Sequence, residues 1–195
     1  MKYIARLCIF IMCLLFTGCS EETQFEKLII ALEERNWKDA AIMLNEFLCT
    51  HDHVLLHTLN GLVHEHLGMS YEDYLNDAKN AYLKVLQSEP GNIPVQISLA
   101  RIHVLLQEYE EAYTILHPLL QKDIKNVDIA YAISFILYRQ KQYEEALKIL
   151  LPAITLAPSF PTLHSLAHNI YTELNYTIYA NHHAWEYKIL TKNEK

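Results

Sequence analysis

The chain has 195 residues, with 16 Lys or Arg against 23 Asp or Glu and a formal net charge of −7 at pH 7. This acidic balance argues against nucleic acid as a partner, because the phosphate backbone requires a basic protein face. It also argues against adsorption to anionic lipid. Only four Gly and six Pro are present, so the sequence has little loop and favours one helical domain over residues 23–190, followed by a polar tail at 191–195.

The first 18 residues are typical of a processing segment. Lys2 and Arg6 provide a short positive region, and the apolar run that follows, Leu7–Phe16, is too short to span a bilayer. Small residues then precede a cysteine in the stretch Phe-Thr-Gly-Cys-Ser at 16–20. This stretch resembles the lipobox of bacterial lipoproteins, although that family usually has leucine where this chain has Phe16.

The resemblance implies that residues 1–18 are removed, that the thiol of Cys19 carries diacylglycerol, and that its new amino end is acylated. Residues 19–22 then form a lipidated tether. Three acyl chains, at about 0.8 kcal/mol per buried CH₂, give a stable anchor. Removal of the segment leaves 14 basic residues against 23 acidic ones, a net charge of −9, so attachment is expected from the acyl chains alone. Ser20 follows the cysteine where an Asp could stand. This resembles the signal by which enteric bacteria sort lipoproteins to the outer membrane over the inner one. A simple signal peptide, or an uncleaved membrane stub, is the alternative.

Seven residues recur at a fixed offset of 34. Tyr109, Glu110, Glu111, Ala112, Ile115, Leu116 and Pro118 return as Tyr143, Glu144, Glu145, Ala146, Ile149, Leu150 and Pro152. Four alanines also fall 34 apart, at Ala78, Ala112, Ala146 and Ala180. An alanine lets one helix backbone approach the next. Self-similarity at this period is typical of stacked helix-turn-helix repeats, and an ordinary helical bundle with accidental repetition is the alternative.

The pattern Tyr-Glu-Glu-Ala, with Leu four residues after the Ala and then Pro, resembles the tetratricopeptide repeat (TPR) family. Ile93–Asn126 and Val127–Phe160 match over their full length. Three degenerate units occupy 23–52, 53–92 and 161–190. The resemblance implies an all-α fold, a right-handed α-solenoid of about five TPR-like helix-turn-helix repeats.

Turn residues are expected at the ends of the units. Pro118 and Pro152 are interpreted as closing their units. In Pro90-Gly91 the proline blocks the helix and the glycine is expected to supply the positive φ of a C-cap. Cys49, the one cysteine beyond Cys19, is expected to be a small buried apolar residue.

In the TPR family, the first helix of each repeat lines a concave groove that holds a peptide or helix of a partner. The resemblance places ten residues of this chain on that stripe. They are Ile97, Arg101, Val104, Leu105, Tyr131, Phe135, Tyr138, Arg139, Ser165 and Asn169. The equivalent residues of the second repeat are Thr58, Leu62, Glu65 and His66.

The fourth repeat carries three aromatic residues on this stripe. Tyr131, Phe135 and Tyr138 follow i, i+4, i+7 spacing and share one helix face, with Arg101 and Arg139 flanking them. Aromatic anchors with Arg beside them are typical of interaction hot spots, and Arg can hold a partner carboxylate with two hydrogen bonds. Interior packing between stacked repeats is the alternative for these aromatic residues.

Eleven histidines are many for this length. His53, His57 and His64 could share one helix face, which makes the His51–His66 segment a candidate metal site. The segment has no His-Glu-x-x-His motif and no nearby Cys, so histidines that bind no metal are favoured. The sequence has no catalytic nucleophile motif and no phosphate-binding glycine loop, so neither enzymatic activity nor a cofactor is expected.

Together these features predict a lipid-anchored TPR protein–protein interaction module of the bacterial cell envelope, facing the periplasm. Its partner is expected to be a peptide or helix of another protein, with no nucleic acid and no small-molecule substrate. Two alternatives remain. One is a pilotin-like or assembly-factor lipoprotein for a secretion, pilus or outer-membrane complex, and the other is a metal-binding protein that uses the His51–His66 cluster.

Overall fold

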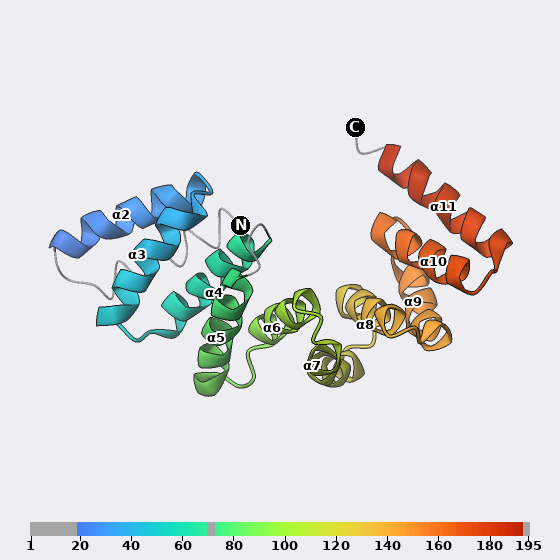
Figure 1. The fold of residues 1–195 in the computed structure, drawn as a ribbon, viewed down its shortest axis with the longest axis horizontal. Helices are drawn as coiled ribbons and strands as arrows, with labels where there is room; N and C mark the ends of the chain where they lie inside the picture. The colour runs from blue at the N-terminus through green and yellow to red at the C-terminus, as the bar shows by residue number, and fades with distance from the viewer. Residues whose placement is uncertain (1–18, 70–72, 193–195) are drawn as a thin grey trace. The chain divides into compact units, whose positions relative to one another are not determined.

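Ten α-helices make up the part of the chain that the computed structural model describes, residues 19–69 and 73–192 (Figure 1). No strand occurs in these ranges. The helices are α2 (Cys19–Glu33), α3 (Trp37–Thr50), α4 (Val54–Gly68), α5 (Asp73–Ser88), α6 (Ile93–Leu105), α7 (Tyr109–Lys122), α8 (Val127–Arg139), α9 (Tyr143–Leu156), α10 (Pro161–Glu173) and α11 (Thr177–Lys192). The predicted all-α repeat fold is confirmed, with one helix-turn-helix pair for each predicted unit.

The two ends of the chain bear on the predicted domain limits. The predicted signal segment, residues 1–18, lies outside the described residues. Helix α2 begins at Cys19, so the backbone of the predicted tether, 19–22, is helical. Helix α11 continues to Lys192, past the predicted end of the repeat domain at 190. No helix within the described ranges is both long enough and apolar enough to cross a membrane.

The chain divides into two compact units, with the boundary between Ile102 and His103 inside α6. In the first unit, α3 packs against α2 and α4, and α4 packs against α5. In the second unit, α8 contacts α7 and α9, while α10 contacts α8, α9 and α11. Each unit therefore has its own helix–helix core.

The alanines that recur with a period of 34 lie at points of close helix packing. Ala78, Ala112 and Ala146 are fully buried, and Ala180 is nearly so. Large side chains fill the space beside them, such as Tyr82 in the first unit and Leu150 in the second, both of which are also buried. In the first unit, Phe25 of α2 also stacks on Phe47 of α3, with ring centroids 4.2 Å apart. The small-and-large alternation of the sequence is thus a packing pattern.

Four turns inside the repeats share one conformation. Arg35, Gln107, Lys141 and Asn175 have φ between 59° and 63°, the left-handed region. The N–H of the residue after each of them donates to a carbonyl five residues earlier, as from Gln142 to Leu137 at 2.8 Å. This is the Schellman ending of a helix, in which the orphan carbonyls of the last turn are satisfied. Three of the four residues lie 34 apart, so the repeat is visible in the backbone as well.

Two expectations about turns are wrong. Gly91 does not have a positive φ; the left-handed positions fall between the two helices of a repeat and are filled by residues other than glycine. Pro118 and Pro152 do not close their helices either, since α7 continues to Lys122 and α9 to Leu156. Both prolines are on the exposed side of their helices, where water can satisfy the carbonyl that loses its N–H partner.

Helices α4 and α5 approach each other through glycine. A Cβ at Gly61 would lie 2.4 Å from Cε1 of Tyr82, and a Cβ at Gly68 would lie 2.3 Å from Cδ2 of Leu75. Such distances are impossible for real atoms unless the neighbour moves, and Tyr82 is only 1% exposed. Glycine is therefore required at these positions by packing, with no left-handed backbone involved.

The prediction for Cys49 is also wrong, because this thiol is free and exposed. The buried face of α3 is formed by Ala40, Ala41, Leu44 and Phe47. Cys49 follows Phe47 by two residues, about 200° around the helix, so it faces away from the core.

Candidate partner-binding site

The predicted aromatic ladder lies on α8, in the second unit. The side chain of Asn126 caps this helix by accepting a hydrogen bond from the N–H of Ile129 at 3.1 Å. Tyr131 and Phe135, one turn apart, stack with ring centroids 6.4 Å apart. Both side chains are half-buried, and burial raises the pKa of Tyr131. The two rings thus form a fixed apolar surface that is still open to solvent.

Arg139 continues this surface by one more turn. Its guanidinium carbon lies 5.8 Å from the ring centroid of Phe135 and 5.4 Å from that of Tyr109, on α7. These are cation–π distances. Arg139 is exposed, and no carboxylate in the described part of the chain pairs with it. Its guanidinium therefore lies against two rings, and its N–H groups are engaged by no carboxylate of residues 19–69 and 73–192.

Tyr109 was not predicted as part of this site. Its hydroxyl is buried and has no hydrogen-bond partner among the described residues. The residue belongs to the repeating Tyr-Glu-Glu-Ala pattern, which by itself indicates only a repeat unit. Its contact with Arg139 joins α7 to α8 and depends on tertiary packing, so the pattern alone could not reveal it.

The third aromatic residue, Tyr138, makes a different contact. Its ring lies 5.9 Å from the ring of Tyr143 on α9, in a tilted arrangement. The hydroxyl of Tyr143 in turn donates to Oε2 of Glu173 at the end of α10, at 3.4 Å. Tyr138 thus has a packing contact within its own repeat, while Tyr131 and Phe135 pair with each other.

Ser165 and Asn169 lie on α10, which contacts α8 in the same unit. Ser165 is half-buried and Asn169 is exposed. Their helix packs with the opposite side, where Leu163, Ala167 and Ile170 are buried.

The predicted stripe of the third repeat is divided between the two units. Ile97 and Arg101 belong to the first unit, and Val104 and Leu105 to the second. Leu105 is exposed, and Val104 and Ile97 are half-buried.

The side chain of Arg101 is occupied by the protein's own Glu65. Its Nη2 donates to Glu65 Oε2 at 3.0 Å, and its Nε donates to Oε1. The hydroxyl of Tyr82 also donates to Oε2 of Glu65, at 2.9 Å. The hydrogen bonds of Arg101 to Glu65 raise the pKa of Arg101. Burial first, and the Glu65 carboxylate second, raise the pKa of Tyr82 above its ordinary value. In this structure the carboxylate that Arg101 holds comes from α4 of the same unit, and Glu65 is a buried residue of the core.

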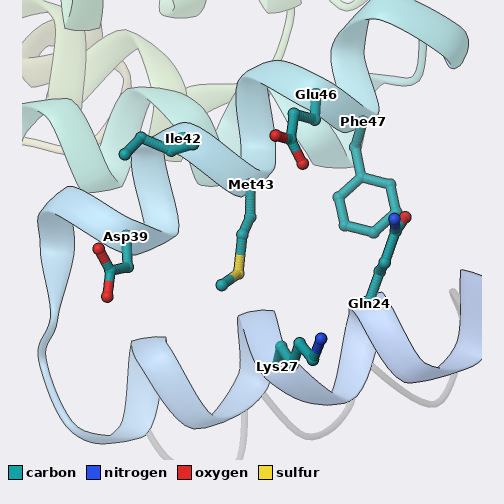
Figure 2. A pocket seen from close by; sticks show the side chains of 7 residues that line it. All are labelled: Gln24, Lys27, Asp39, Ile42, Met43, Glu46 and Phe47. Atoms are coloured by element: carbon teal, nitrogen blue, oxygen red, sulfur yellow. The ribbon is translucent and has the colours of Figure 1, made fainter.

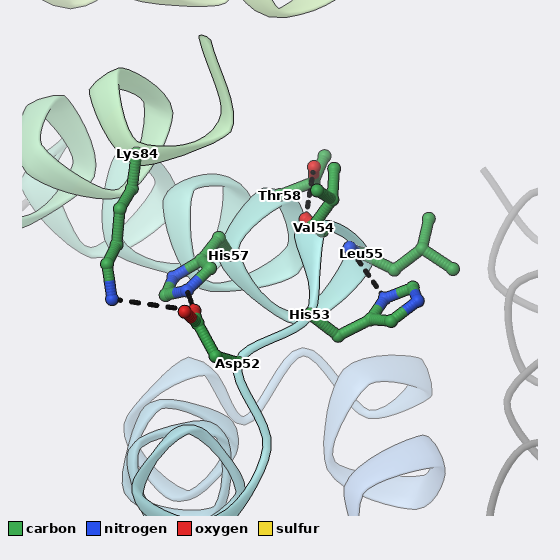
Figure 3. Close-up of polar contacts among 7 residues, drawn as sticks. All are labelled: Asp52, His53, Val54, Leu55, His57, Thr58 and Lys84. Carbon is green, nitrogen blue, oxygen red and sulfur yellow. Dashed lines mark hydrogen bonds and ion pairs between the residues drawn. The ribbon is translucent and has the colours of Figure 1, made fainter. Parts of the chain in front are cut away.

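The histidines of the second repeat have individual structural contacts. His53 caps α4 by accepting from the N–H of Leu55 at 3.2 Å. His57 donates from Nε2 to Oδ1 of Asp52 at 2.7 Å, and Lys84 lies 3.6 Å from the same carboxylate (Figure 3). The hydrogen bond from His57, followed by the charge of Lys84, lowers the pKa of Asp52.

His64 donates from Nδ1 to the backbone carbonyl of Asn60 at 2.9 Å, and His66 stacks on Trp37 with ring centroids 4.4 Å apart. In the described ranges, no three His, Cys, Asp or Glu side chains gather as metal ligands would. The contacts of His53, His57 and His64 thus give no support to the predicted metal alternative.

A second group of histidines joins α10 to α11. His164 and His183 are buried, and their Nδ1 atoms lie 3.1 Å apart. Because His164 donates from Nε2 to the carbonyl of Pro158 at 2.9 Å, its Nδ1 accepts from His183 when both rings are neutral. Burial first, and the neighbouring His164 second, lower the pKa of His183 from 6.5 to about 4.

A further hollow of about 260 Å³ lies between α2 and α3 (Figure 2). It is lined by Gln24, Lys27, Asp39, Ile42, Met43, Glu46 and Phe47. Ile42 is 59% exposed beside it. The sequence does not predict this hollow, because apolar residues on α3 are equally compatible with a core position.

Comparison with known proteins supports the fold. The family described as anaphase-promoting complex, cyclosome, subunit 3, matches residues 72–153. No curated protein matches the sequence.

Among solved structures, MamA 41-end from Desulfovibrio magneticus RS-1 aligns with a TM-score of 0.79 at 14% identity, over 92% of this chain and 99% of that one. The MamA RS-1 ArsTM double mutant gives 0.78 at 14% identity, over the same shares. MamA MSR-1 gives 0.70 at 17% identity, over 91% and 100%. At these identities the likeness concerns the fold, and the fold of this chain is that of a TPR-like helical-repeat protein.

Proposed function

We propose that this chain is a protein-binding module that holds a peptide or helix of another protein against α8 and α10. The observation that carries the proposal is the surface made by Tyr131, Phe135 and Arg139, in which an exposed guanidinium lies against aromatic rings and has no carboxylate partner in the described part of the chain. Rigid aromatic anchors beside an arginine are enriched among the residues that dominate binding energy. The mechanism is a preorganised surface that performs no chemistry on its partner.

The chemistry of the surface suggests what the partner presents. The half-buried rings of Tyr131 and Phe135 offer contact to an apolar side chain, and Arg139 can hold a carboxylate with two parallel hydrogen bonds. Exposed Asn169 on α10 adds an amide that donates and accepts. An amphipathic helix or an extended peptide with an apolar residue near an acidic one fits this arrangement.

The proposal includes attachment to a bacterial envelope membrane through a lipid on Cys19, with the repeats facing the periplasm. It rests on the positive start, the short apolar run and the small residues before Cys19 in the sequence. Attachment would hold the binding surface near the membrane, where envelope proteins are its available partners.

Site-specific photo-crosslinking in cells tests the binding surface. A photoreactive phenylalanine analogue at Phe135 is expected to give a discrete adduct whose mass identifies the partner. The same analogue at Lys148, an exposed position on α9, serves as the control and is expected to give none. In addition, Arg139→Ala should reduce the adduct at Phe135, because a charge-assisted hydrogen bond contributes about 1.5–3 kcal/mol. Absence of an adduct at Phe135, or equal adducts at both positions, would rule out this surface.

A further inference from the structure

A polar groove lies in the first unit, among α3, α4 and α5. It has a volume of about 360 Å³. We call this hollow the polar groove because its lining includes Asn45, His57, Asn60, His64, Asp77 and Asn80. The groove involves the second helices α3 and α5, whereas the predicted partner stripe belongs to the first helices. It is therefore a different surface from the one proposed above, and neither proposal depends on the other.

The floor of the groove is polar at positions where the fourth repeat has buried apolar residues. Counted from the residue that caps the helix, the fourth, seventh and eleventh residues of α4 are His57, Asn60 and His64. The same positions of α8, counted from its cap Asn126, are Ala130, Ile133 and Leu137. All six side chains are buried. Three buried polar residues have thus replaced an apolar stripe at the same place in the repeat.

Two of these three buried polar side chains, His57 and His64, have hydrogen-bond partners within the protein, whereas the side-chain oxygen of Asn60 has none among the described residues. His57 is bonded to Asp52, and His64 is bonded to a backbone carbonyl. Asn60 is 8% exposed, and its side-chain oxygen has no hydrogen-bond partner among the described residues. A buried polar atom without a partner lowers stability and requires an explanation. Rotation of the Asn60 amide group about χ2, a soft torsion, can turn this oxygen toward the groove that Asn60 lines.

The composition of the groove indicates the chemistry of its occupant. Amide groups from three helices, on Asn45, Asn60 and Asn80, offer donors and acceptors without net charge. The cation of the lining, Lys84, lies 3.6 Å from Asp52 and is neutralised by it. No Phe, Tyr or Trp is among the lining residues, and the rings of His57 and His64 are buried, so a sugar ring or a base finds little ring face to stack on there.

We propose that the polar groove binds an extended, uncharged peptide segment through its main-chain amide groups, with the Asn60 side-chain oxygen accepting one of its N–H groups. The side chains of Asn45 and Asn80 are placed to pair with further main-chain groups, and the Asp77 carboxylate accepts an N–H at the rim. The hydrogen bond between His57 and Asp52 (Figure 3) fixes the neighbouring ring in place, so the floor is ordered before the ligand arrives.

Side-chain amide NMR tests the proposal with N-acetyl-trialanine amide, a probe that offers main-chain groups and no charge. With ¹⁵N-labelled full chain in detergent, the NH₂ signals of Asn45, Asn60 and Asn80 are expected to shift and to saturate with peptide. Asn60→Leu introduces the residue type that the third repeat has at this position, Leu99. In this variant the peptide concentration that half-saturates the shifts of Asn45 and Asn80 should rise about tenfold, the effect of losing one hydrogen bond to a buried group. The unfolding temperature of the variant should rise, which separates lost binding from lost folding.

Two controls make the result decisive. Asn181→Leu removes an exposed amide of the other unit, on α11, and should leave the peptide shifts of the groove unchanged. A neutral disaccharide, trehalose, should give no shift. A half-saturating peptide concentration that is unchanged in Asn60→Leu, the absence of any peptide shift in the groove, or a shift with the disaccharide alone would each overturn the proposal.

Discussion

At the scale of single residues, this chain places ordinary side chains in a conformation that glycine favours. Arg35, Gln107, Lys141 and Asn175 all adopt a left-handed φ near 60°. A side chain with a Cβ loses about 1–2 kcal/mol in that region relative to the right-handed one. The Schellman hydrogen bonds of each turn hold the backbone there in spite of this strain. Part of the strain should be recoverable by substitution.

Lys141→Gly is expected to increase the free energy of unfolding by about 0.5–1 kcal/mol, because glycine adopts a positive φ without strain while its extra freedom in the unfolded chain offsets part of the gain. Chemical denaturation measures the change. The same replacement at Lys148, in the middle of α9, should have the opposite sign and lower stability by about 1 kcal/mol. If both variants lose stability equally, the left-handed turn carries no strain.

The second residue-scale prediction concerns His183, whose pKa is lowered from 6.5 to about 4 by burial and by His164. Between these two values the unfolded chain binds a proton that the folded chain does not. Stability should therefore rise with pH across this window and fall as the pH drops from about 6.5 to about 4. His183→Phe keeps a ring to stack against Tyr171, as His183 does at 5.6 Å, and should flatten the slope.

Chemical denaturation of the unmodified chain and of His183→Phe at several pH values between 4 and 7 measures the two slopes. Ile178→Phe, at an exposed position of the same helix, adds a ring without changing a titratable group. It serves as the control and should keep the slope of the unmodified chain. An unchanged slope in His183→Phe would show that the pH dependence arises at other groups.

At the scale of helices, close approach decides how α4 and α5 pair. Gly61 receives the ring of Tyr82, and Gly68 receives the side chain of Leu75. The hydroxyl of Tyr82 then reaches Glu65 on the same helix as the two glycines, and Glu65 holds Arg101 of α6. Three helices of the first unit are thus joined by one ring that fits only against a bare backbone.

Gly61→Ala should lower the free energy of unfolding by about 1–3 kcal/mol, the range for overpacking a well-packed core. The added methyl would overlap a ring that is fully surrounded and cannot move aside. Thermal and chemical unfolding check this result. Gly91→Ala is the control, since a Cβ at that position meets nothing within 4 Å. A Gly61→Ala chain as stable as the Gly91→Ala chain would mean that Tyr82 has room to shift.

At the scale of the whole molecule, the acidic composition and the proposed anchor act together. A net charge of −7 gives the protein no attraction to anionic lipid. Membrane attachment, if it rests on Cys19, must come from acyl chains, and several chains give a stable anchor where one gives only marginal binding. The proposal therefore depends on a single thiol and can be tested at that thiol.

Cys19→Ala is expected to abolish incorporation of radiolabelled palmitate and to move the protein from the detergent phase to the aqueous phase in a phase-partition experiment. Cys49→Ala is the control. It removes an exposed thiol that could itself take up label, and it should leave both labelling and partition unchanged. Label that is lost with Cys49 and kept with Cys19→Ala would contradict the lipoprotein proposal.

The sequence by itself determined the helical repeats, because their signals are local and periodic. The residues that recur at an offset of 34, including the buried alanines, can be recognised along the chain without knowing how the helices pack. The acidic Glu pairs that start α7 and α9 belong to the same class of signal. Such features fix where helices begin and which of their faces is buried.

Tertiary structure alone decided which side chains meet across helices. The stripe of the second and third repeats placed Glu65 and Arg101 as neighbours of a partner, but the fold pairs them with each other. The fold also places the ring of Tyr109 against the guanidinium of Arg139. It leaves the side-chain oxygen of Asn60 without a hydrogen-bond partner in the described part of the chain. Periodicity specifies the face of a helix on which a side chain lies. The hydrogen-bond partner of that side chain comes from another helix, whose distance and rotation are set by the packing of the whole unit.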